Sequence, residues 1–371
     1  MWFGVGTRGV KSVRSAATWL AITAVLIGTG GTDASGILAA GAGSIPGGLA
    51  DSGSQHSILA RPRSAAIAAG QTASPASPTA SHPTSRPSSG SRPSPRPQAA
   101  SGPPHVLVLM EENKNAGVLS GAPYLDGLAA AYASSSRWFG VDHPSAPNYV
   151  ALTSGSTQSV VGDCTPPSCG PYAAPSLGGQ LTAAGIPWAA YMESMPSPCF
   201  TKPTAGEYAE KHDPFVYFDD VLHNGCADHV LPYPGAAGLV AALDGPNAPD
   251  FVWITPNLLD DMHDGSVAQG DAWARANLGP VLTSRWFTDY DSTVIITMDE
   301  GDNDAGASCC GQRAGGPIPL IVVSNTNAGT GSVSITGDQY GTLRSIEQEF
   351  GLPLLGDAAD AANGDCLSFF A

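Results

Sequence analysis

The sequence predicts an α/β domain with three layers, a mostly parallel sheet covered by helices on both faces. Short, almost wholly apolar runs alternate with segments of helical spacing, which is the pattern of a sheet buried on both sides. Hydrophobic residues form 42% of the 371 residues, enough for a sizeable core. Polar residues also follow directly after several of the apolar runs, where open α/β sheets place their ligands.

The first half of the folded part contains two expected strands and two expected helices. His105 to Met110 is an apolar run as expected for a fully buried strand, and 124–133 has helical spacing. A second helix is expected at 177–184, because Gly185 follows it at the position where glycine commonly ends helices. The apolar run 187–192 follows at once and is expected to be a strand.

The second half continues the alternation. The runs 251–255 and 293–297 are rich in β-branched and aromatic residues and predict two further buried strands. A last strand is expected at 318–323, followed by an amphipathic helix at 340–350. Apolar strands that alternate with helices in this way indicate parallel pairing.

The first 104 residues differ in composition from the rest. A basic start and a short apolar stretch, 19–27, predict a secretory signal peptide or an uncleaved N-terminal anchor within residues 1–34. The stretch is shorter than the roughly 20 residues that span a bilayer. Residues 35–104 are rich in Ala, Ser and Pro and are expected to be a disordered linker. The folded domain is expected at 105–371, and the protein is expected to be secreted.

Charge is distributed unevenly between these parts. The chain has 16 Lys and Arg and 32 Asp and Glu, of which eight basic and two acidic residues precede His105. The folded part therefore holds eight basic and 30 acidic residues, which excludes nucleic acid as a general partner. Excess carboxylates favour divalent metal ions instead. The mildly basic linker is either a plain spacer or a contact with an anionic cell wall.

All seven cysteines lie in the folded part, which agrees with export to an oxidising compartment. Cys164 and Cys169 have a spacing that a small disulfide loop can close. Two further pairs are tentative interpretations, because connectivity does not follow from sequence. They are Cys199 with Cys226, and Cys366 with either Cys309 or Cys310.

Three clusters of polar residues stand at the expected carboxyl ends of strands. They are 111–113, 257–264 and 299–302. A pair of acids after one strand is most often a solvated turn, but three clusters on one sheet are expected to converge and repel one another. Carboxylate, amide and imidazole groups suit a hard or borderline divalent ion that would hold them together.

A fourth cluster surrounds Ser145, which precedes Pro147 at an expected helix start. A serine at this place is either an N-cap or a nucleophile, and a nucleophile needs a base or a metal ion to activate it. Lys211 and His212 are candidates for holding a phosphate or protonating a leaving oxygen, although a solvated pair is an equal alternative.

The chain also resembles a known family over roughly 106–352. The strings HVLVLMEEN, HPSAPNYVALTSGST, YMESMPSPC, EKHDPFVYF, PDFVWITPNLLDDMHD and VIITMDEGD occur in the order of that family. It is the phosphoesterase family of bacterial acid phosphatases and phospholipase C enzymes, within the alkaline phosphatase superfamily. The resemblance implies an alkaline-phosphatase-like α/β/α fold and hydrolysis of phosphoric esters.

The resemblance also implies roles for individual residues. Ser145 matches a residue that is phosphorylated during turnover, and Asn148 matches an amide that contacts a phosphoryl oxygen. His263 matches, less securely, a second metal ligand and is also a candidate for contacting the substrate, as is Lys211. The implied metal ligands are Glu112, Asn113, Asp299, Glu300 and, less securely, Asp261. One departure is Pro317, which stands where similar sequences carry a histidine, so that one metal position is expected to be incomplete.

The sequence thus predicts a secreted, metal-dependent hydrolase of small phosphoric esters that acts through a phosphoserine. An acid-phosphatase-like phosphomonoesterase is the preferred interpretation. The alternatives are a phospholipase C-type phosphodiesterase, with a phospholipid headgroup as substrate, and an inactive metal-binding module tethered to the cell wall. Metal identity and number do not follow from the sequence.

Overall fold

The computed structural model describes residues 102–302, 307–312, 314–326 and 331–366. The expected signal peptide or anchor and almost all of the expected linker lie outside these residues, so those predictions are not tested. In the part that is described, no helix combines the length and the apolar character that crossing a membrane requires.

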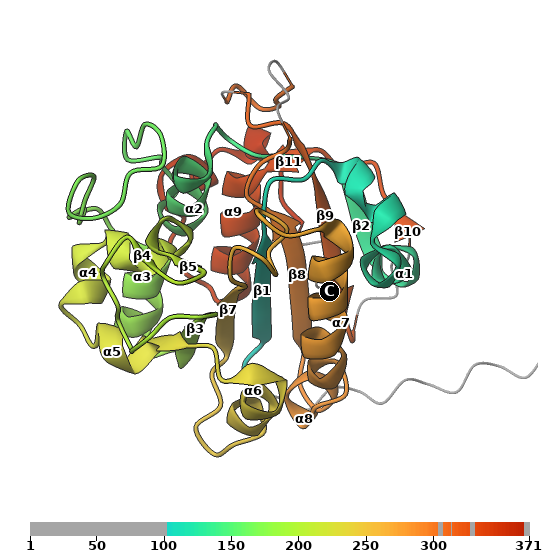
Figure 1. Ribbon diagram of the computed structural model, residues 1–371, viewed down its shortest axis with the longest axis horizontal. Coiled ribbons are helices and arrows are strands. Elements are labelled where there is room, and N and C mark those ends of the chain that lie inside the picture. Colours follow the sequence, from blue (N-terminus) through green and yellow to red (C-terminus); the bar gives the residue numbers. More distant parts are fainter. Residues whose placement is uncertain (1–101, 303–306, 313, 327–330, 367–371) are drawn as a thin grey trace, which may run out of the picture. The chain divides into compact units, whose positions relative to one another are not determined.

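A nine-stranded sheet forms the centre of the described domain (Figure 1). Its order is β10-β2-β9-β8-β1-β7-β3-β6, and β11 also pairs with β2. Among its pairings, only those of β9 with β2 and with β8 are antiparallel, which confirms the predicted mostly parallel sheet. The strands are β1 (His105–Glu111), β2 (Ala133–Phe139), β3 (Trp188–Met192), β6 (Val230–Pro232), β7 (Phe251–Thr255), β8 (Ser292–Met298), β9 (Pro317–Ser324), β10 (Gly331–Ser332) and β11 (Gly337–Asp338). A separate hairpin pairs β4 (Thr204–Ala205) with β5 (Tyr208–Ala209).

Helices cover both faces of the sheet. On one face α7 contacts α1 and α6, and α7 stands in front of the strands in Figure 1; the other group joins α2 to α3 and α9. This arrangement confirms the predicted three layers. The α-helices are α1 (Pro123–Ala131), α2 (Ser145–Ser154), α3 (Leu177–Ala184), α4 (Asp219–Leu222), α5 (Cys226–His229), α6 (Gly235–Leu243), α7 (Val267–Val281), α8 (Arg285–Thr288) and α9 (Gln339–Glu349). Short 3-10 helices are η1 (Ala116–Gly121), η2 (Glu210–His212), η3 (Pro214–Tyr217), η4 (Gly356–Ala359) and η5 (Ala361–Asn363).

The strands and helices expected from the sequence are all present, with ends within two residues of the expected ones. Three larger elements, α6 among them, were not predicted. β2 has the sequence ASSSRWF, whose serines do not resemble a strand of the core. α7 is the longest helix in the described residues, but Gly270 and Pro280 interrupt its pattern with residues that disfavour helices.

Two of the three expected disulfides are confirmed, Cys164–Cys169 and Cys199–Cys226. The third expectation was wrong, because Cys309 bonds to Cys310 and Cys366 remains a free thiol. Cys366 is fully buried against α9, where its N–H donates to Ser345 Oγ at 2.8 Å. The adjacent pair instead lies in a partly exposed loop.

The sheet brings the three polar clusters to one edge. β7, β1 and β8 are neighbours and run parallel, so their carboxyl ends point the same way. Every residue in these three strands is buried, which leaves only the residues after each strand to meet a ligand. The edge of the sheet therefore fixes the place of the candidate site.

Two glycines let the chain close around the end of β8. A Cβ atom built on Gly315 would lie 2.2 Å from the Gly140 carbonyl carbon, and one on Gly140 would lie 2.9 Å from the Asp299 carbonyl oxygen. Both distances are shorter than any side chain tolerates, so only glycine permits this close backbone contact. The contact brings the segment after β2 against the acids that follow β8.

We expect a buried acid in α9 to make stability depend on pH. Burial raises the pKa of Glu347 in α9 from 4.5 to about 8, and its Oε1 accepts the Leu355 N–H. Between these pH values the folded chain keeps a proton that the unfolded chain releases. The free energy of unfolding should therefore fall as the pH rises through this window, by up to about 1.4 kcal/mol per pH unit.

Glu347→Gln keeps an acceptor for Leu355 but cannot titrate. Urea unfolding measured from about pH 5 to pH 8 should show a smaller loss of stability for this variant than for the wild type. Glu207→Gln, at an exposed position, is the matched control and should keep the wild-type slope. Equal slopes in all three proteins would show that Glu347 holds no such proton.

Candidate functional site

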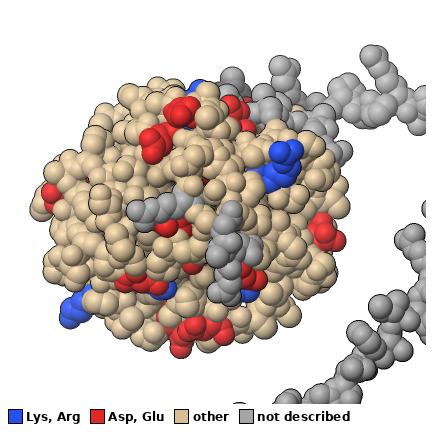
Figure 2. Space-filling model, turned by 90° about the horizontal axis from the view of Figure 1, so that it is seen from above, with Lys and Arg blue, Asp and Glu red and all other residues tan. Residues whose placement is uncertain are grey.

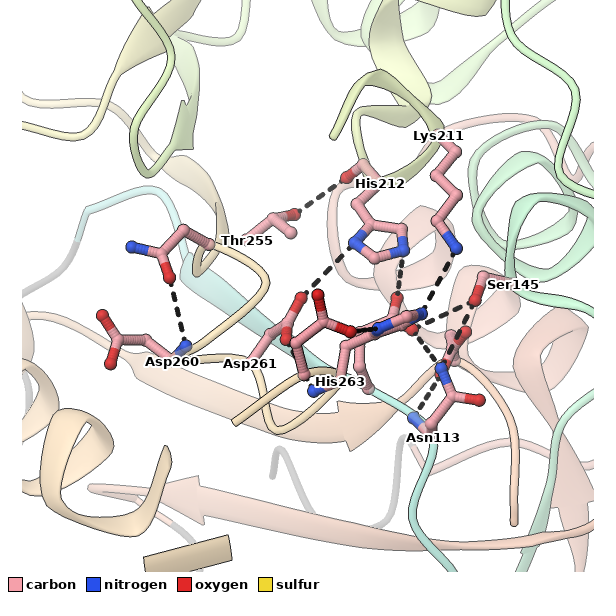
Figure 3. Close-up of polar contacts among 12 residues, drawn as sticks. Asn113, Ser145, Lys211, His212, Thr255, Asp260, Asp261 and His263 are labelled. Carbon is pink, nitrogen blue, oxygen red and sulfur yellow. Dashed lines mark hydrogen bonds and ion pairs between the residues drawn. The ribbon is translucent and has the colours of Figure 1, made fainter. Parts of the chain in front are cut away.

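Side chains from four separate parts of the chain meet at the carboxyl edge of the sheet (Figure 3). Glu112 and Asn113 follow β1, Asp299 follows β8, and Ser145 begins α2. The Ser145 hydroxyl donates to Glu112 Oε2 at 3.1 Å, and the Asn113 N–H donates to Asp299 Oδ1 at 2.8 Å. Asp261, after β7, accepts the Glu112 N–H through its carbonyl oxygen at 2.8 Å. The structure therefore confirms the prediction that the polar clusters after these strands converge.

Ser145 is the first residue of α2, and its side chain does not cap the helix. The N-cap residue is Pro144, and Pro147 occupies the first turn. Instead of turning back to the helix, the Ser145 hydroxyl points at Glu112, and the Asn113 side-chain amide approaches it at 3.5 Å. The N-cap alternative is therefore excluded. The serine oxygen is held beside a carboxylate that can accept its proton.

Glu112 is the centre of the contacts in the site. Its side chain is fully buried and receives three donors: the Ser145 hydroxyl, the Tyr149 hydroxyl at 2.5 Å and the Asn113 side-chain amide at 2.7 Å. Burial, followed by repulsion from Asp299 and Asp261, raises the pKa of Glu112 well above its usual range. A buried carboxylate in this setting requires positive charge or a proton nearby.

His212, in η2, lies between two carboxylates. Its Nε2 is 3.2 Å from Glu112 Oε1 and its Nδ1 is 3.4 Å from Asp261 Oδ2, while its ring stacks on Tyr149 at 5.2 Å between centroids. Burial, and then the charge of Lys211, lower the pKa of His212 to about 3. Both effects favour the neutral form of the ring. Both of its nitrogens face carboxylates, so this geometry does not favour the expected role of protonating a leaving oxygen.

Lys211 and His263 form the outer part of the site. Lys211 Nζ donates to Asp163 Oδ2 at 2.8 Å and lies 3.4 Å from His263 Nε2. Burial is the largest single effect on the pKa of Lys211 and would lower it, but the hydrogen bond to Asp163 together with the nearby carboxylate charges outweighs burial and raises the pKa. Asp163 also accepts the Ala146 N–H at the start of α2. The lysine is thus a charged group fixed beside the helix that carries Ser145.

Asn148 differs from its expected role. Its side chain is fully buried, with Oδ1 accepting the N–H groups of Val141 and Asp142 at 2.7 and 3.1 Å and Nδ2 donating to the Asp142 carbonyl at 2.9 Å. These contacts use the amide to hold the segment before α2. The expectation that Asn148 contacts a phosphoryl oxygen is therefore not favoured, and Asn148 is better described as a positioning residue.

Glu300 faces the rim of the site rather than Ser145. Its Oε2 is 2.7 Å from His143 Nδ1 and 3.5 Å from Asn148 Nδ2. Burial, and then repulsion from Asp299, raise the pKa of Glu300 to about 9. Among the five implied metal ligands, Glu300 differs in that the group closest to its carboxylate is an imidazole, that of His143.

Three residues of the site were not singled out from the sequence: His143, Asp163 and Tyr149. Tyr149 and His143 lie within the same string as Ser145, and the i, i+4 spacing from Ser145 to Tyr149 is a signal that could have identified the tyrosine. Asp163 lies in a loop next to Cys164 and carries no such pattern. Only the fold brings it to Lys211.

An open cavity of about 760 Å³ leads to the site, lined by Asn113, Lys114, His143, Pro144, His263, Glu300, Gly301 and Asp302. Ser145 and Glu112 are almost wholly buried and lie behind this lining. Figure 2 looks down on the molecule from above Figure 1 and shows more acidic than basic side chains on that face. The few cations near the site are therefore the groups that can attract an anion to it.

The donor set fits a divalent cation. One ligand atom each from Glu112, His212 and His263 lies within 4.8 Å of the other two. Asp299 Oδ2 and Asp261 Oδ2 are buried and have no hydrogen-bond donor among the described residues, although His212 lies near the latter. Burial raises the pKa of Asp261 to about 7. Carboxylate oxygens left without donors and imidazole nitrogens beside them are suitable ligands for a borderline divalent ion.

A family model and several known proteins have sequences similar to this chain. A sequence model described as the phosphoesterase family matches residues 118–353. The phosphatidylinositol-3-phosphatase of Mycobacterium tuberculosis is 33% identical over 260 residues, which cover 69% of this chain and 80% of that protein. The acid phosphatase of Aspergillus fumigatus is 27% identical over 228 residues, covering 59% of this chain, which spans only 48% of that protein.

Solved structures give more distant likenesses. A protein of the alkaline phosphatase superfamily from Vibrio parahaemolyticus has a TM-score of 0.47 at 12% identity, covering 70% of each chain. The lipoteichoic acid synthase of Listeria monocytogenes has a TM-score of 0.48 at 13% identity, covering 70% of this chain and 76% of that one.

We expect the Tyr149 hydroxyl to stabilise the folded chain through Glu112. Tyr149→Phe keeps the ring that stacks on His212 but removes a donor from the buried Glu112 carboxylate. The free energy of unfolding should fall by about 1–3 kcal/mol, measured by urea unfolding. Tyr191→Phe is the control, because the Tyr191 ring is buried and its hydroxyl makes no hydrogen bond with a described residue. An equal effect of both substitutions would contradict the specific role of Tyr149.

Proposed function

Because the chain belongs to the phosphoesterase family, we propose that it hydrolyses phosphoric monoesters by transferring their phosphoryl group to Ser145. The family match and the phosphatase relatives make the chain a phosphoric ester hydrolase. The ester class and the phosphoserine mechanism are the proposal. The observation that carries it is the contact of 3.1 Å between the Ser145 hydroxyl and the buried Glu112 carboxylate.

Ser145 and Glu112 are the proposed reacting pair. Glu112 Oε2 accepts the Ser145 hydroxyl, so the serine oxygen carries lone pairs directed away from Glu112 and toward an incoming phosphorus atom. The start of α2 adds the positive end of the helix dipole, which favours the phosphoryl oxygens. As the serine oxygen bonds to phosphorus, the ester O–P bond breaks and the alcohol leaves with the proton that the serine hydroxyl gave up. Water then cleaves the phosphoseryl ester, which releases inorganic phosphate and returns a proton to the serine oxygen.

The proposed metal ligands are Glu112, Asn113, Asp261, Asp299 and Glu300, with the imidazoles of His212 and His263 beside them. A divalent ion bound there would neutralise phosphoryl oxygens and lower the pKa of the serine hydroxyl. Hydrogen bonds among these proposed ligands already hold some of their side chains together. Asn113 holds Asp299 through its backbone and Glu112 through its side chain, so a single residue ties together the ends of β1 and β8.

Lys211 and His263 are the proposed contacts for the substrate. A monoester carries up to two negative charges, and the acidic domain would repel it without a cation at the mouth of the site. The Lys211 ammonium lies 3.4 Å from His263, which lines the cavity. The position of this pair favours a role in binding the phosphoryl group, with the ester group directed into the cavity.

A small phosphate monoester is the proposed substrate. The Mycobacterium relative is named for a phosphoinositide and the Aspergillus relative as an acid phosphatase. Both names describe phosphatases, which supports a monoester over a phospholipase C-type diester. A panel that contains soluble monoesters, phosphoinositide headgroups and choline phosphodiesters would separate these substrates.

Export is part of the proposal. The expected signal peptide or anchor, together with disulfides in the folded domain, supports a secreted or surface-attached enzyme. The basic linker would then act as a spacer between the cell surface and the catalytic domain, or as a contact with the cell wall. Fractionation of cells that express the full chain would locate the enzyme.

We expect Ser145→Ala to abolish turnover. The variant removes the nucleophile, so release of p-nitrophenol from its phosphate ester should fall by at least about a thousandfold. Ser154→Ala, at the other end of α2, is the matched control and should leave turnover unchanged, since the Ser154 hydroxyl donates only to backbone carbonyls. Acid-quenched wild-type enzyme should carry phosphate on the peptide that contains Ser145. Retained turnover in Ser145→Ala would refute the mechanism.

We expect Asp299→Asn to weaken binding of a divalent cation. Asparagine keeps an acceptor for the Asn113 N–H but loses the charge beside the buried, unpartnered oxygen. Addition of Mn²⁺ or Zn²⁺ after chelation should raise the unfolding temperature of the wild type and restore its turnover, because a ligand of the folded state stabilises it. Both effects should be weak in Asp299→Asn. The exposed Asp126→Asn is the control, and an equal response of both variants would exclude Asp299 as a ligand.

A further inference from the structure

A second group of potential metal ligands shares no residue with the Ser145 site. It consists of Cys309, Cys310 and Asp338, whose ligand atoms all lie within 4.8 Å of one another. The cysteines belong to the loop between β8 and β9, and Asp338 ends β11 directly before α9. The cluster therefore joins a loop to the start of a helix.

The two carboxylate oxygens of Asp338 differ: one accepts hydrogen bonds, and the other has no hydrogen-bond partner among the described residues. Its Oδ1 caps α9 by accepting the N–H groups of Tyr340 and Gly341 at 2.9 and 3.3 Å. Its Oδ2 is buried, has no hydrogen-bond partner among the described residues, and belongs to a side chain that is fully buried. A buried carboxylate oxygen without a donor is unfavourable, and a cation or proton would satisfy it.

Cys309 and Cys310 form a disulfide with each other in this structure, and both are partly exposed. A small thiol in solution can therefore reach the bond. Two thiol molecules RSH would reduce it, giving two cysteine thiols and one molecule of RSSR. The reduced cysteines, together with the unpartnered oxygen of Asp338, would present two sulfurs and one oxygen to a cation.

We propose that Cys309, Cys310 and Asp338 form a site for a thiophilic divalent cation, Zn²⁺ or Cd²⁺, which opens when a thiol reduces the Cys309–Cys310 bond. Binding releases the two thiol protons, so two thiolates and one carboxylate coordinate the ion. Thiolate ligands select Zn²⁺ and related soft ions over Mg²⁺ and Ca²⁺. The site differs in this respect from the donor set near Ser145, which contains no sulfur.

The test is a Cd²⁺ titration of the full chain, with and without prior reduction by a thiol that is then removed under anaerobic conditions. Thiolate coordination to Cd²⁺ gives an ultraviolet charge-transfer band that a site of oxygen and nitrogen ligands cannot produce. We expect the band in the reduced protein, with a final intensity that corresponds to one thiolate-bound Cd²⁺ per chain, and no band in the oxidised protein. A reduced protein without the band would overturn the proposal.

Variants assign the band to these residues. Cys309→Ser/Cys310→Ser should lose it, although this protein still contains Cys366 and the four cysteines of the other two bridges. A band that survives in the double variant would arise from those thiols and would refute the assignment. The single variants Cys309→Ser and Cys310→Ser provide a second measurement, and each should bind Cd²⁺ more weakly than the wild type.

Asp338→Asn tests the carboxylate separately from the helix cap. Asparagine caps helices as well as aspartate does, so α9 should remain intact. The affinity of the reduced protein for Cd²⁺ should nevertheless fall by about tenfold or more. Asp360→Asn, which alters the cap of η5, is the matched control and should bind as the wild type does. Unchanged affinity in Asp338→Asn would remove Asp338 from the site.

Discussion

The burial of like charges at the ends of three neighbouring strands is the constraint on which this structure depends. Glu112, Asp261 and Asp299 lie close enough that repulsion contributes to the raised pKa of Glu112. Folding tolerates this repulsion because donors from other segments surround the carboxylates. The Tyr149 hydroxyl and the Asn113 N–H are the closest of these donors. The same repulsion would be relieved by a cation bound at this edge of the sheet.

Three residues on one buried face of helix α2 make contacts within the candidate site. Ser145, Asn148 and Tyr149 are spaced i, i+3 and i+4, so they lie on the same side of the helix. Ser145 presents the hydroxyl, Asn148 holds the segment before the helix, and Tyr149 fixes Glu112 and stacks on His212. All ten residues of α2 are buried, and this packing holds the Ser145 hydroxyl in place.

The sequence predicted the fold better than it predicted the contacts within the site. The core strands were predictable because burial on both faces gives β1, β7 and β8 uninterrupted apolar runs. The convergence of the polar clusters was also predictable, because parallel strands end at the same edge of the sheet. The environment of His212 and the link from Asp163 to Lys211 depend on loops whose course has no local signal. The bond between Cys309 and Cys310 was missed because loop geometry, rather than spacing, decides the pairing.

The parts of the site lie far apart along the chain, and this separation limits when their contacts can form. Asn113 and Asp299 are 186 residues apart, and their contact requires β8 to pair with β1. A nascent chain that has emerged only as far as β7 therefore has its serine and Glu112 but lacks one side of the sheet around them. Contacts between such distant parts of the chain form late in folding. The contact between Asn113 and Asp299 can thus form only after most of the domain has been translated.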